Sequence, residues 1–443
     1  MPGVGYDSWS HDREQRAIPH DSARARRHDQ MPMNPTSVLL VTPRWTRDGG
    51  VATHVMASAA VLGEHGLDVS VLAARIESSA RIPGVTLLHS PELFNTEVSP
   101  DARLGEAMSS QPAMIHLHQF DDPEVVAFMQ LSTPVVISAH GYTACTSGVH
   151  YFRPGQECTR PHGLGCIPNL AVRGCAHTRH PRSLPSAYGR ASRGLAALRR
   201  ADLAVSYSSA VDRHLSANGV TRRKVVPLFT TMVPMIGTGH AARRRVVFAG
   251  RVIAPKGVGV LIRAARSVDA EFVICGDGWR LDAVRRLARR LGVLERVSFK
   301  GWLGAEELAR ELAEASVVVL PSVWPEPFGL VGIEALAAGR PVIASSTGGV
   351  GDWLEDGVNG LCVKPGDPSA LARALTELLA DPTRQQTMGA AGKKIVATRF
   401  SQDQHFAALA EAYRTARATW ESEPRGSSPG IQTSETRAQP SRV

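Results

Sequence analysis

The sequence predicts an α/β protein built from two doubly wound domains, each a parallel sheet flanked by helices. Three observations support this prediction. A chain of 443 residues is too long for one ordinary hydrophobic core. Short apolar runs alternate with longer segments of helical period, which is typical of parallel sheets covered by helices. The alternation occurs twice, on either side of a stretch at residues 227–245 that contains prolines and glycines.

The punctuated stretch predicts a linker between the two domains. We expect residues 36–230 to form an amino-terminal domain and residues 240–398 a carboxyl-terminal domain. Residues 399–420 have an apolar stripe at helical spacing, so we expect a helix that packs back on the amino-terminal domain. Residues 1–35 and 421–443 are polar and lack periodicity, which indicates disordered extensions.

The individual elements follow from the apolar runs. In the first domain the runs predict strands at 37–42, 67–73, 85–88, 113–117, 134–138 and 203–206. In the second domain they predict strands at 245–249, 271–275, 296–299, 316–320, 340–344 and 360–363. The intervening segments 257–268, 280–291, 306–315, 329–338 and 369–379 predict helices, and the last helix should span about 402–419.

Composition limits the class of protein. An apolar share of 43% with 21% charged residues indicates a globular chain, and no apolar run resembles a signal peptide or a membrane span. The net charge of +9 comes largely from arginines on predicted helix faces, without the interleaved aromatics of a nucleic-acid surface. We therefore expect a cytoplasmic protein without a nucleic-acid partner, and peripheral membrane contact stays open.

The segment VVVLPSVWPEPFGLVGIEALAAGRPVIAS, residues 317–345, carries the clearest chemical signal. Glu326 precedes a proline and should lie in a loop after a buried strand, whereas Glu334 should lie within the following helix. The amides of Phe328, Gly329 and Leu330 fall at the amino terminus of that helix, where free N–H groups favour a phosphate. The segment predicts a nucleotide site in which the carboxylates accept hydrogen bonds from hydroxyl groups.

A second segment supplies positive charge. GRVIAPKG, residues 250–257, follows a predicted strand and places Arg251 and Lys256 in one loop. Two cations there can converge on a diphosphate.

Together these segments resemble glycosyltransferase family 4, in which the first segment is an E-x7-E motif. The resemblance extends over nearly all of residues 37–415 and implies the GT-B fold, two Rossmann-like domains that face each other across a cleft. It implies that Glu326 contacts the donor sugar, that Glu334 contacts the ribose, and that Arg251 and Lys256 neutralise the diphosphate. It also implies base contacts around Trp302.

The first domain offers further candidates. Gly49 and Gly50 precede a helix, and the resemblance assigns such a loop to the diphosphate and the acceptor. His140 follows a strand, and the resemblance implies that it touches the donor sugar. His118 ends another strand, and we place it in the acceptor region. His116 shares a strand face with His118 by the period of two but should pack in the core.

Four cysteines, Cys145, Cys158, Cys166 and Cys175, lie in a Gly- and Pro-containing insertion at residues 145–175. Their spacings lack the tight C-x2-C pairs of most structural zinc sites, so a zinc site is only a weak alternative to an acceptor-binding loop. Cys275 and Cys362 fall in strands and should be core residues.

The function that we predict is hexosyl transfer from a UDP- or GDP-sugar to an acceptor hydroxyl, and the acceptor stays unidentified. The chain has no Asp-x-Asp motif, so Arg251 and Lys256 would replace a metal ion, and we expect no required cofactor. The resemblance implies retention of anomeric configuration. The alternatives are a nucleotide-sugar epimerase on the same fold and a non-enzymatic nucleotide-sugar sensor.

Overall fold

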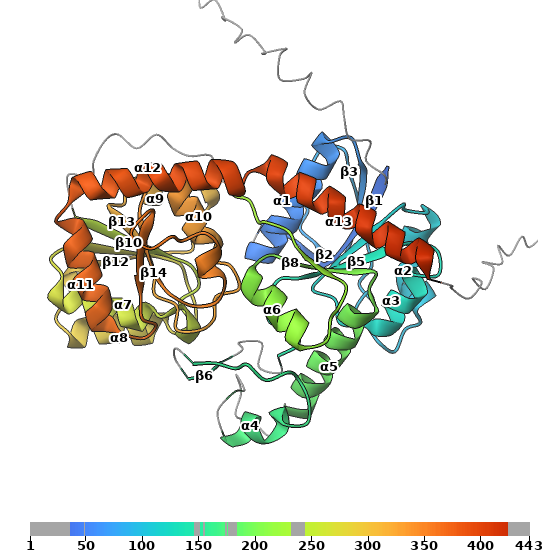
Figure 1. Cartoon of the computed structure of the whole chain (residues 1–443), viewed down its shortest axis with the longest axis horizontal. Coiled ribbons are helices and arrows are strands. Elements are labelled where there is room, and N and C mark those ends of the chain that lie inside the picture. Colours follow the sequence, from blue (N-terminus) through green and yellow to red (C-terminus); the bar gives the residue numbers. More distant parts are fainter. Residues whose placement is uncertain are drawn as a thin grey trace, which may run out of the picture. The chain divides into compact units, whose positions relative to one another are not determined.

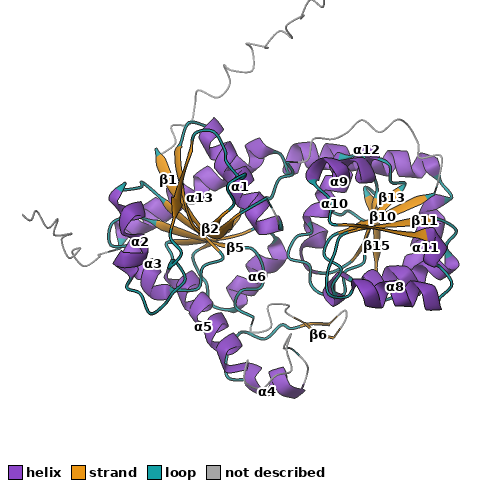
Figure 2. Ribbon diagram, turned by 180° about the vertical axis from the view of Figure 1, so that it is seen from behind, coloured by secondary structure: helices purple, strands orange, loops and turns teal. Residues whose placement is uncertain are grey.

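A computed structural model describes residues 36–47, 49–145, 151–153, 156–172, 175, 184–231 and 244–423. The predicted extension 1–35 lies outside these residues, as do most of the predicted tail and most of the linker. Two parallel sheets with helices on both faces make up the described chain (Figures 1 and 2).

The amino-terminal sheet has seven strands in the order β3-β2-β1-β4-β5-β8-β9. Its strands are β1 (Ser37–Trp45), β2 (Asp68–Ile76), β3 (Val85–His89), β4 (Ile115–His118), β5 (Val135–Ala139), β8 (Leu203–Ser206) and β9 (Arg223–Val225). Its helices are α1 (Gly50–Glu64), α2 (Pro100–Ser109), α3 (Pro123–Met129), α5 (Leu184–Arg200) and α6 (Ser209–Ala217). The central strands are almost fully buried, which explains why β5 and β8 are largely apolar, whereas β4 buries His116 and His118.

The carboxyl-terminal sheet has six strands in the order β12-β11-β10-β13-β14-β15. Its strands are β10 (Arg245–Ala249), β11 (Glu271–Cys275), β12 (Val297–Gly301), β13 (Val317–Leu320), β14 (Val342–Ser345) and β15 (Gly360–Val363). The α-helices of this half are α7 (Val258–Ala264), α8 (Leu281–Arg290), α9 (Ala305–Ala313), α10 (Leu330–Ala337), α11 (Pro368–Leu379) and α12 (Pro382–Arg399). Short 3-10 turns include η2 (Ala254–Lys256) and η5 (Gly348–Asp352).

The last helix, α13 (Gln402–Ser422), packs on the amino-terminal half although it follows α12 directly (Figure 1). It contacts α1, β5 and β8. Leu409, Ala410 and Tyr413 of its apolar stripe are buried. The helix runs to Ser422 rather than ending near residue 419.

The predicted elements differ from the observed ones mainly at their ends. β1 continues to Trp45, three residues beyond the predicted end, because its paired strand β2 also continues to Ile76. The sequence prediction missed β9, whose short segment Arg223–Val225 is too polar to stand out and pairs only with β8. Pairing with a neighbouring strand is a tertiary property that local periodicity does not contain.

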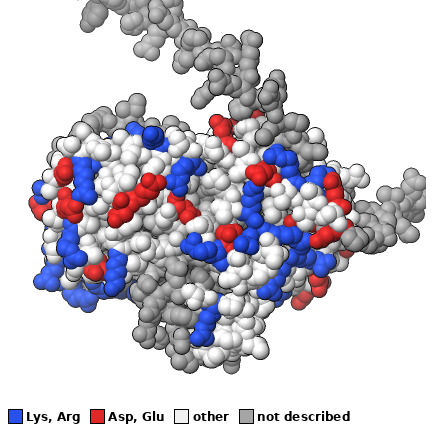
Figure 3. Space-filling model, viewed as in Figure 1, with Lys and Arg blue, Asp and Glu red and all other residues white. Residues whose placement is uncertain are grey.

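The insertion contains the hairpin β6 (Tyr151–Arg153) and β7 (Gln156–Glu157) and the short helix α4 (Cys166–Val172). Charged side chains of both signs are mixed on the face of the molecule that Figure 3 shows. Within the described ranges, every helix is too short or too polar to pass through a lipid bilayer.

Candidate functional site

The site candidates of the carboxyl-terminal half lie where its strand order reverses. Strands β11 and β12 lie on one side of β10, and β13, β14 and β15 on the other. The loop after β10 carries Arg251 and Lys256, and the loop after β13 carries Glu326. Parallel sheets bind ligands at such a switch point, beyond the carboxyl ends of the strands. The topology therefore brings together candidates that are about seventy residues apart in sequence.

Glu326 and Lys256 form a direct ion pair. The Lys256 ammonium donates to one carboxylate oxygen of Glu326 across 2.6 Å. The other oxygen accepts from the Ser322 hydroxyl at 2.8 Å and from the Trp324 indole at 3.1 Å. The Glu326 side chain is only 5% exposed, whereas Lys256 is 22% exposed and keeps donor capacity for a ligand.

This environment keeps Glu326 ionised. Burial alone would raise the pKa of its carboxyl group, but the Lys256 charge and the hydrogen bonds from Lys256, Ser322 and Trp324 outweigh burial and lower the pKa. The carboxylate in turn holds the Lys256 ammonium in place. Lys256 is therefore a pre-positioned cation rather than a mobile surface side chain.

Glycine allows the two loops to pack this closely. Gly257 has φ of +68°, and a Cβ atom there would lie 1.8 Å from the carbonyl oxygen of Pro321. The amide of Val323 also bonds to the carbonyl of Pro255 at 2.9 Å, which joins the loop after β13 to η2. A side chain at position 257 would push these loops, and with them Lys256 and Glu326, apart.

Arg251 lies in the same loop and differs from Lys256 in its environment. Its side chain is exposed and has no hydrogen-bond or ion-pair partner among the residues that the structure describes. The backbone around it is nevertheless held, because Gly250 and Val252 donate to Cys275 and Asp277 at 2.9 and 2.8 Å. Arg251 is thus an available cation on an anchored loop.

Glu334 lies in α10 and is partly buried. Its carboxylate makes no hydrogen bond and no ion pair within the described parts of the chain. Burial without a partner raises the pKa of Glu334 to about 7. An unsatisfied carboxyl group of this kind is suited to accept hydrogen bonds from ligand hydroxyls.

The first turn of α10 provides the predicted amide cluster. Gly329 is the residue before the helix and has φ of +88°, a conformation that favours glycine. The Phe328 carbonyl accepts from the Trp353 indole at 2.7 Å, which fixes the approach to the helix. Leu330 is partly buried as the first helical residue. The free N–H groups of this turn and the positive end of the helix dipole favour an anion.

Trp302 follows β12 and is 55% exposed, consistent with the predicted contact to a ligand base. The sequence analysis did not single out Trp279, which follows β11 and is 71% exposed, with the Arg280 guanidinium 5.3 Å from its ring centre. It also missed Ser322 and Trp324, which hold Glu326. Both residues lie close before Glu326 in the same loop, four and two residues away, and this proximity could have indicated that they contact Glu326.

The candidates of the amino-terminal half also lie at carboxyl ends of strands. Gly49 follows β1, has φ of +94° and caps α1, whereas Gly50 is the first residue of that helix. A Cβ atom at Gly50 would meet nothing within 4 Å, and its φ is not positive. Neither packing nor backbone conformation requires glycine at position 50, so a ligand that approaches the backbone is one physical reason for it.

His118 and His140 are in direct contact. His118 ends β4 and is fully buried, and its Nδ1 atom lies 3.0 Å from Nε2 of the partly buried His140. Burial, reinforced by neighbouring histidines, holds the pKa of both imidazoles well below the usual value, so both are neutral. His118 thus reaches the site only through His140, and His116 is buried as predicted.

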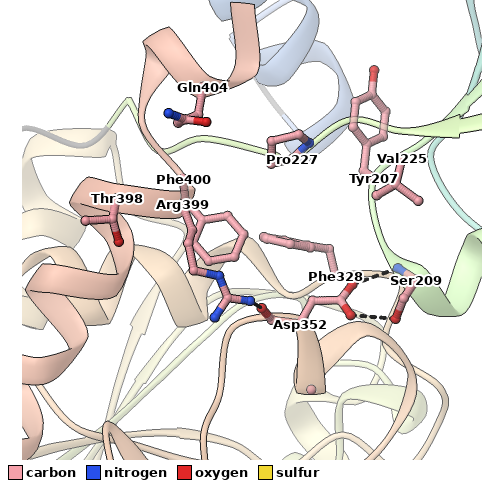
Figure 4. Close-up of a pocket in the computed structure, with 11 residues that line it drawn as sticks. Tyr207, Ser209, Val225, Pro227, Phe328, Asp352, Thr398, Arg399, Phe400 and Gln404 are labelled. Atoms are coloured by element: carbon pink, nitrogen blue, oxygen red, sulfur yellow. Dashed lines mark hydrogen bonds between the residues drawn. The ribbon is translucent and has the colours of Figure 1, made fainter. Parts of the chain in front are cut away.

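The loop that carries His140 lies next to the loop that carries Glu326. A Cβ atom at Gly141 would lie 3.7 Å from Cγ of Pro327. Nearby, Asp352 accepts from the backbone amide of Ser209 at 2.7 Å and from its hydroxyl at 2.5 Å (Figure 4). Beside this contact lies a pocket of about 470 Å³. It is lined by Tyr207, Ser209, Val225, Pro227, Phe328, Gly351, Asp352, Thr398, Arg399, Phe400 and Gln404.

The cysteines do not form a metal centre in the part of the chain that the structure describes. Cys145, Cys158, Cys166 and Cys175 are partly buried. No group of three or more potential ligands there is arranged to hold a metal ion. The residues between these cysteines at 146–150, 154–155 and 173–174 lie outside the described ranges. Cys275 is buried as predicted, whereas Cys362 is only partly buried because β15 is the edge strand.

Comparisons with known proteins show similarity to glycosyltransferases. Residues 240–395 match the family model described as glycosyl transferases group 1. The D-inositol 3-phosphate glycosyltransferase of Xylanimonas cellulosilytica is 36% identical over 232 residues, which cover 48% of this chain and 54% of the relative. The GDP-mannose-dependent alpha-(1-6)-phosphatidylinositol monomannoside mannosyltransferase of Mycolicibacterium smegmatis is 37% identical over 166 residues, covering 35% and 44%. The chain thus spans about half the length of these curated relatives.

The fold as a whole is similar to a solved structure. Anabaena HepE, determined in complex with UDP and glucose, superposes with a TM-score of 0.63 at 19% identity, covering 86% of this chain and all of that one. At this identity the likeness concerns the fold alone. We conclude that the chain has the GT-B fold of glycosyltransferases and that its residues 240–395 match a glycosyl transferases group 1 domain.

Proposed function

We propose that the protein is a retaining glycosyltransferase that moves a hexosyl group from a UDP- or GDP-sugar to an acceptor hydroxyl without a metal ion. The observation that carries this proposal is the pairing of Lys256 with Glu326 beside the free cation Arg251 at the switch point. A GDP-mannose-dependent relative and a structural neighbour solved with UDP support a nucleotide-sugar donor.

In this proposal the carboxyl-terminal half binds the donor. Arg251, Lys256 and the first-turn amides of α10 stabilise the diphosphate as its bond to the sugar breaks, which is electrostatic stabilisation by pre-positioned donors. Glu334 accepts hydrogen bonds from the ribose hydroxyls, and Trp302 lies beside the base. Glu326 orients Lys256 and faces the sugar side of the diphosphate.

The amino-terminal half then presents the acceptor. Gly50 allows close approach of the ligand to the start of α1, and His140 touches the donor sugar. The leaving phosphate accepts the acceptor's proton, a step that follows from the family resemblance. The two relatives described above are named transferases, which favours transfer over the alternative of epimerisation.

The first experiment identifies the donor. Thermal unfolding of the full chain is followed with UDP, GDP, ADP and TDP, each with magnesium and with EDTA. A nucleotide at 100 times its dissociation constant should stabilise the protein by about 2.7 kcal/mol. We expect UDP or GDP to stabilise it equally in both conditions. Stabilisation that requires magnesium contradicts the metal-independent mechanism.

The second experiment tests catalysis. The protein is incubated with the matching nucleotide hexoses and with acceptors that include D-inositol 3-phosphate, and released diphosphate and product anomer are measured. Arg251→Ala should lower kcat about 100-fold, as loss of one transition-state donor typically does. It is the cleanest variant, because Arg251 supports no other described side chain, whereas removing Lys256 leaves the buried Glu326 unpaired.

Arg266→Ala is the matched control. This exposed arginine lies before β11, at the amino ends of the strands, whereas Arg251 follows the carboxyl end of β10, so the control removes the same charge from the opposite end of the strands. We expect wild-type transfer from this variant. A folded Arg251→Ala protein that transfers sugar at the wild-type rate would refute the assigned mechanism. Product that forms without any acceptor would instead identify an epimerase.

A further inference from the structure

The side chain of His140 is held by a second histidine that is itself excluded from solvent. His118 ends β4, and its parallel partner in β5 is Ser138, two residues before His140. Because side chains alternate along a strand, His118, Ser138 and His140 point to the same face of the sheet. The two imidazoles meet there, with His118 Nδ1 and His140 Nε2 only 3.0 Å apart.

The remaining ring nitrogens of the pair have different surroundings. Nε2 of His118 is buried and makes no hydrogen bond with any residue that the structure describes. Nδ1 of His140 also bonds to none of the described residues, but this side chain is partly exposed. The bond between the rings therefore leaves one nitrogen of the pair, Nδ1 of His140, available to a ligand.

The burial of His118 decides the direction of this hydrogen bond. Both rings are neutral, because burial lowers the pKa of each, so only one proton lies between them. If His118 carried its proton on Nε2, a buried N–H group would have no acceptor, at a cost of about 1–3 kcal/mol. Unpaired buried donors are rarer than unpaired buried acceptors. His118 therefore donates from Nδ1, and His140 accepts at Nε2 and carries its own proton on Nδ1.

Neighbouring rings restrict the orientation of His140 further. The ring centres of Tyr207 and His54 lie 4.9 and 5.7 Å from the ring centre of His140. Tyr207 is itself fixed by a 2.6 Å hydrogen bond between its hydroxyl and that of Ser138. A 180° flip of the His140 ring would place the carbon Cε1 where Nε2 lies and would lose the bond to His118.

We propose that His118 is a positioning residue that holds His140 in one orientation and one tautomer, with the Nδ1–H group directed toward the ligand. The group that this N–H recognises is an oxygen acceptor, such as a sugar hydroxyl. The predicted effect of His118 on catalysis rests on the proposed glycosyl transfer. The proton position of His140 is a property of the free protein and does not depend on that function.

The first test reads the proton positions directly. The full chain is labelled with 15N in its histidines, and long-range 1H–15N correlation spectra distinguish protonated from bare ring nitrogens. A His140→Gln variant identifies the signals of His140. We expect His140 to carry its proton on Nδ1, and His118→Leu to shift it toward Nε2, the site that free neutral imidazole prefers. A proton on Nε2 of His140 in the wild type overturns the proposal.

The second test separates positioning from a merely structural role. His118→Leu should lower kcat for transfer by about 10- to 100-fold, the typical effect of a misplaced reacting group. His118→Asn should restore most of kcat, because its amide can donate near the position of Nδ1. Thermal unfolding and nucleotide binding are measured in both variants, so a misfolded protein is recognised.

His116→Leu is the control for the loss of a buried histidine from the same strand. His116 bonds to Tyr413 and Ser138 rather than to His140, so its loss should reduce stability without lowering kcat. A His118→Leu protein that is folded and transfers like the wild type overturns the proposal. If no donor supports transfer in the wild type, the proposed function fails, and the proton position of His140 still decides the positioning role.

Discussion

At the scale of single residues, the site combines one satisfied and one unsatisfied carboxylate. Glu326 is buried and accepts from Lys256, Ser322 and Trp324. Glu334, eight residues later, is partly buried and has no partner in the described chain. The partners of Glu326 stabilise its negative charge in the free protein. The carboxyl group of Glu334 remains able to accept hydrogen bonds from a ligand.

Glu334→Gln should therefore stabilise the free protein at high pH. The folded-state pKa of about 7 lies above the ordinary glutamate pKa of 4.5, so the native state holds this proton more tightly than the unfolded state. The tighter binding of this proton contributes stability below the pKa that Glu334 has in the unfolded chain. That contribution is lost as pH rises through 7. At pH 8 we expect Glu334→Gln to unfold with up to about 3 kcal/mol more stability than the wild type.

The difference should disappear near pH 4.5, and denaturant unfolding at the two pH values measures it. Nucleotide affinity should fall in the same variant, because glutamine offers the ribose only one, neutral acceptor oxygen. Glu295→Gln, at an exposed position of the same half, controls for the loss of one negative charge. Equal stability of the wild type and Glu334→Gln at pH 8 contradicts the inferred environment of Glu334.

At the scale of elements, our proposal places the ligand at the starts of two helices. α10 begins after Gly329, and α1 begins at Gly50 after Gly49. Gly49 and Gly329 have positive φ, so backbone geometry explains them. Gly50 has neither a positive φ nor a close neighbour, so backbone geometry and packing do not explain why this residue is glycine. We attribute it to the approach of a ligand.

Gly50→Val tests this reading of α1. A Cβ atom at this exposed position meets no atom within 4 Å, so stability should change by no more than about 0.5 kcal/mol, as at other open surface positions. Transfer should fall at least about 10-fold, because the side chain would occupy space next to the ligand. Kinetics and thermal unfolding of the same preparation measure both effects.

Gly63→Val is the matched control, since Gly63 lies near the other end of α1 and its Cβ also meets nothing within 4 Å. We expect normal transfer from it. If Gly50→Val transfers as well as this control, no ligand approaches the start of α1.

At the scale of the whole molecule, α13 ties the end of the chain to the first sheet. The Tyr413 hydroxyl bonds to Nδ1 of the buried His116 at 2.9 Å, and His405 bonds to the carbonyl of Pro227 at 2.7 Å. Arg417 and Trp420 donate to the backbone carbonyls of Ala113 and Gln130. The amino-terminal half is thus completed by residues that follow the carboxyl-terminal half in sequence.

Tyr413→Phe should destabilise the amino-terminal half. It leaves a buried nitrogen of His116 without its partner, at a cost of about 1–3 kcal/mol. Hydrogen exchange in β4 and β5 measures the local effect, and denaturant unfolding measures the total. Thr415→Val is the control, because that hydroxyl is exposed and bonds only within α13. Unchanged exchange protection of β4 in Tyr413→Phe would mean that α13 does not support the sheet.

The sequence by itself determined the fold class and most of the donor-site candidates. Most of the buried parallel strands are apolar runs. The loops that follow two of them carry Arg251, Lys256 and Glu326, and Glu334 follows Glu326 at a recognisable spacing, in α10. These are local patterns, so one sequence contains them. The same holds for the amphipathic stripe of α13.

Only the tertiary structure decided which side chains meet. The pairing of Lys256 with Glu326 depends on the reversal of strand order between β10 and β13. The contact between His118 and His140 depends on the register of β4 with β5, and a shift by one residue would turn His118 to the other face. The partners, burial and protonation of these groups are therefore set by contacts between distant segments, which local spacing does not encode.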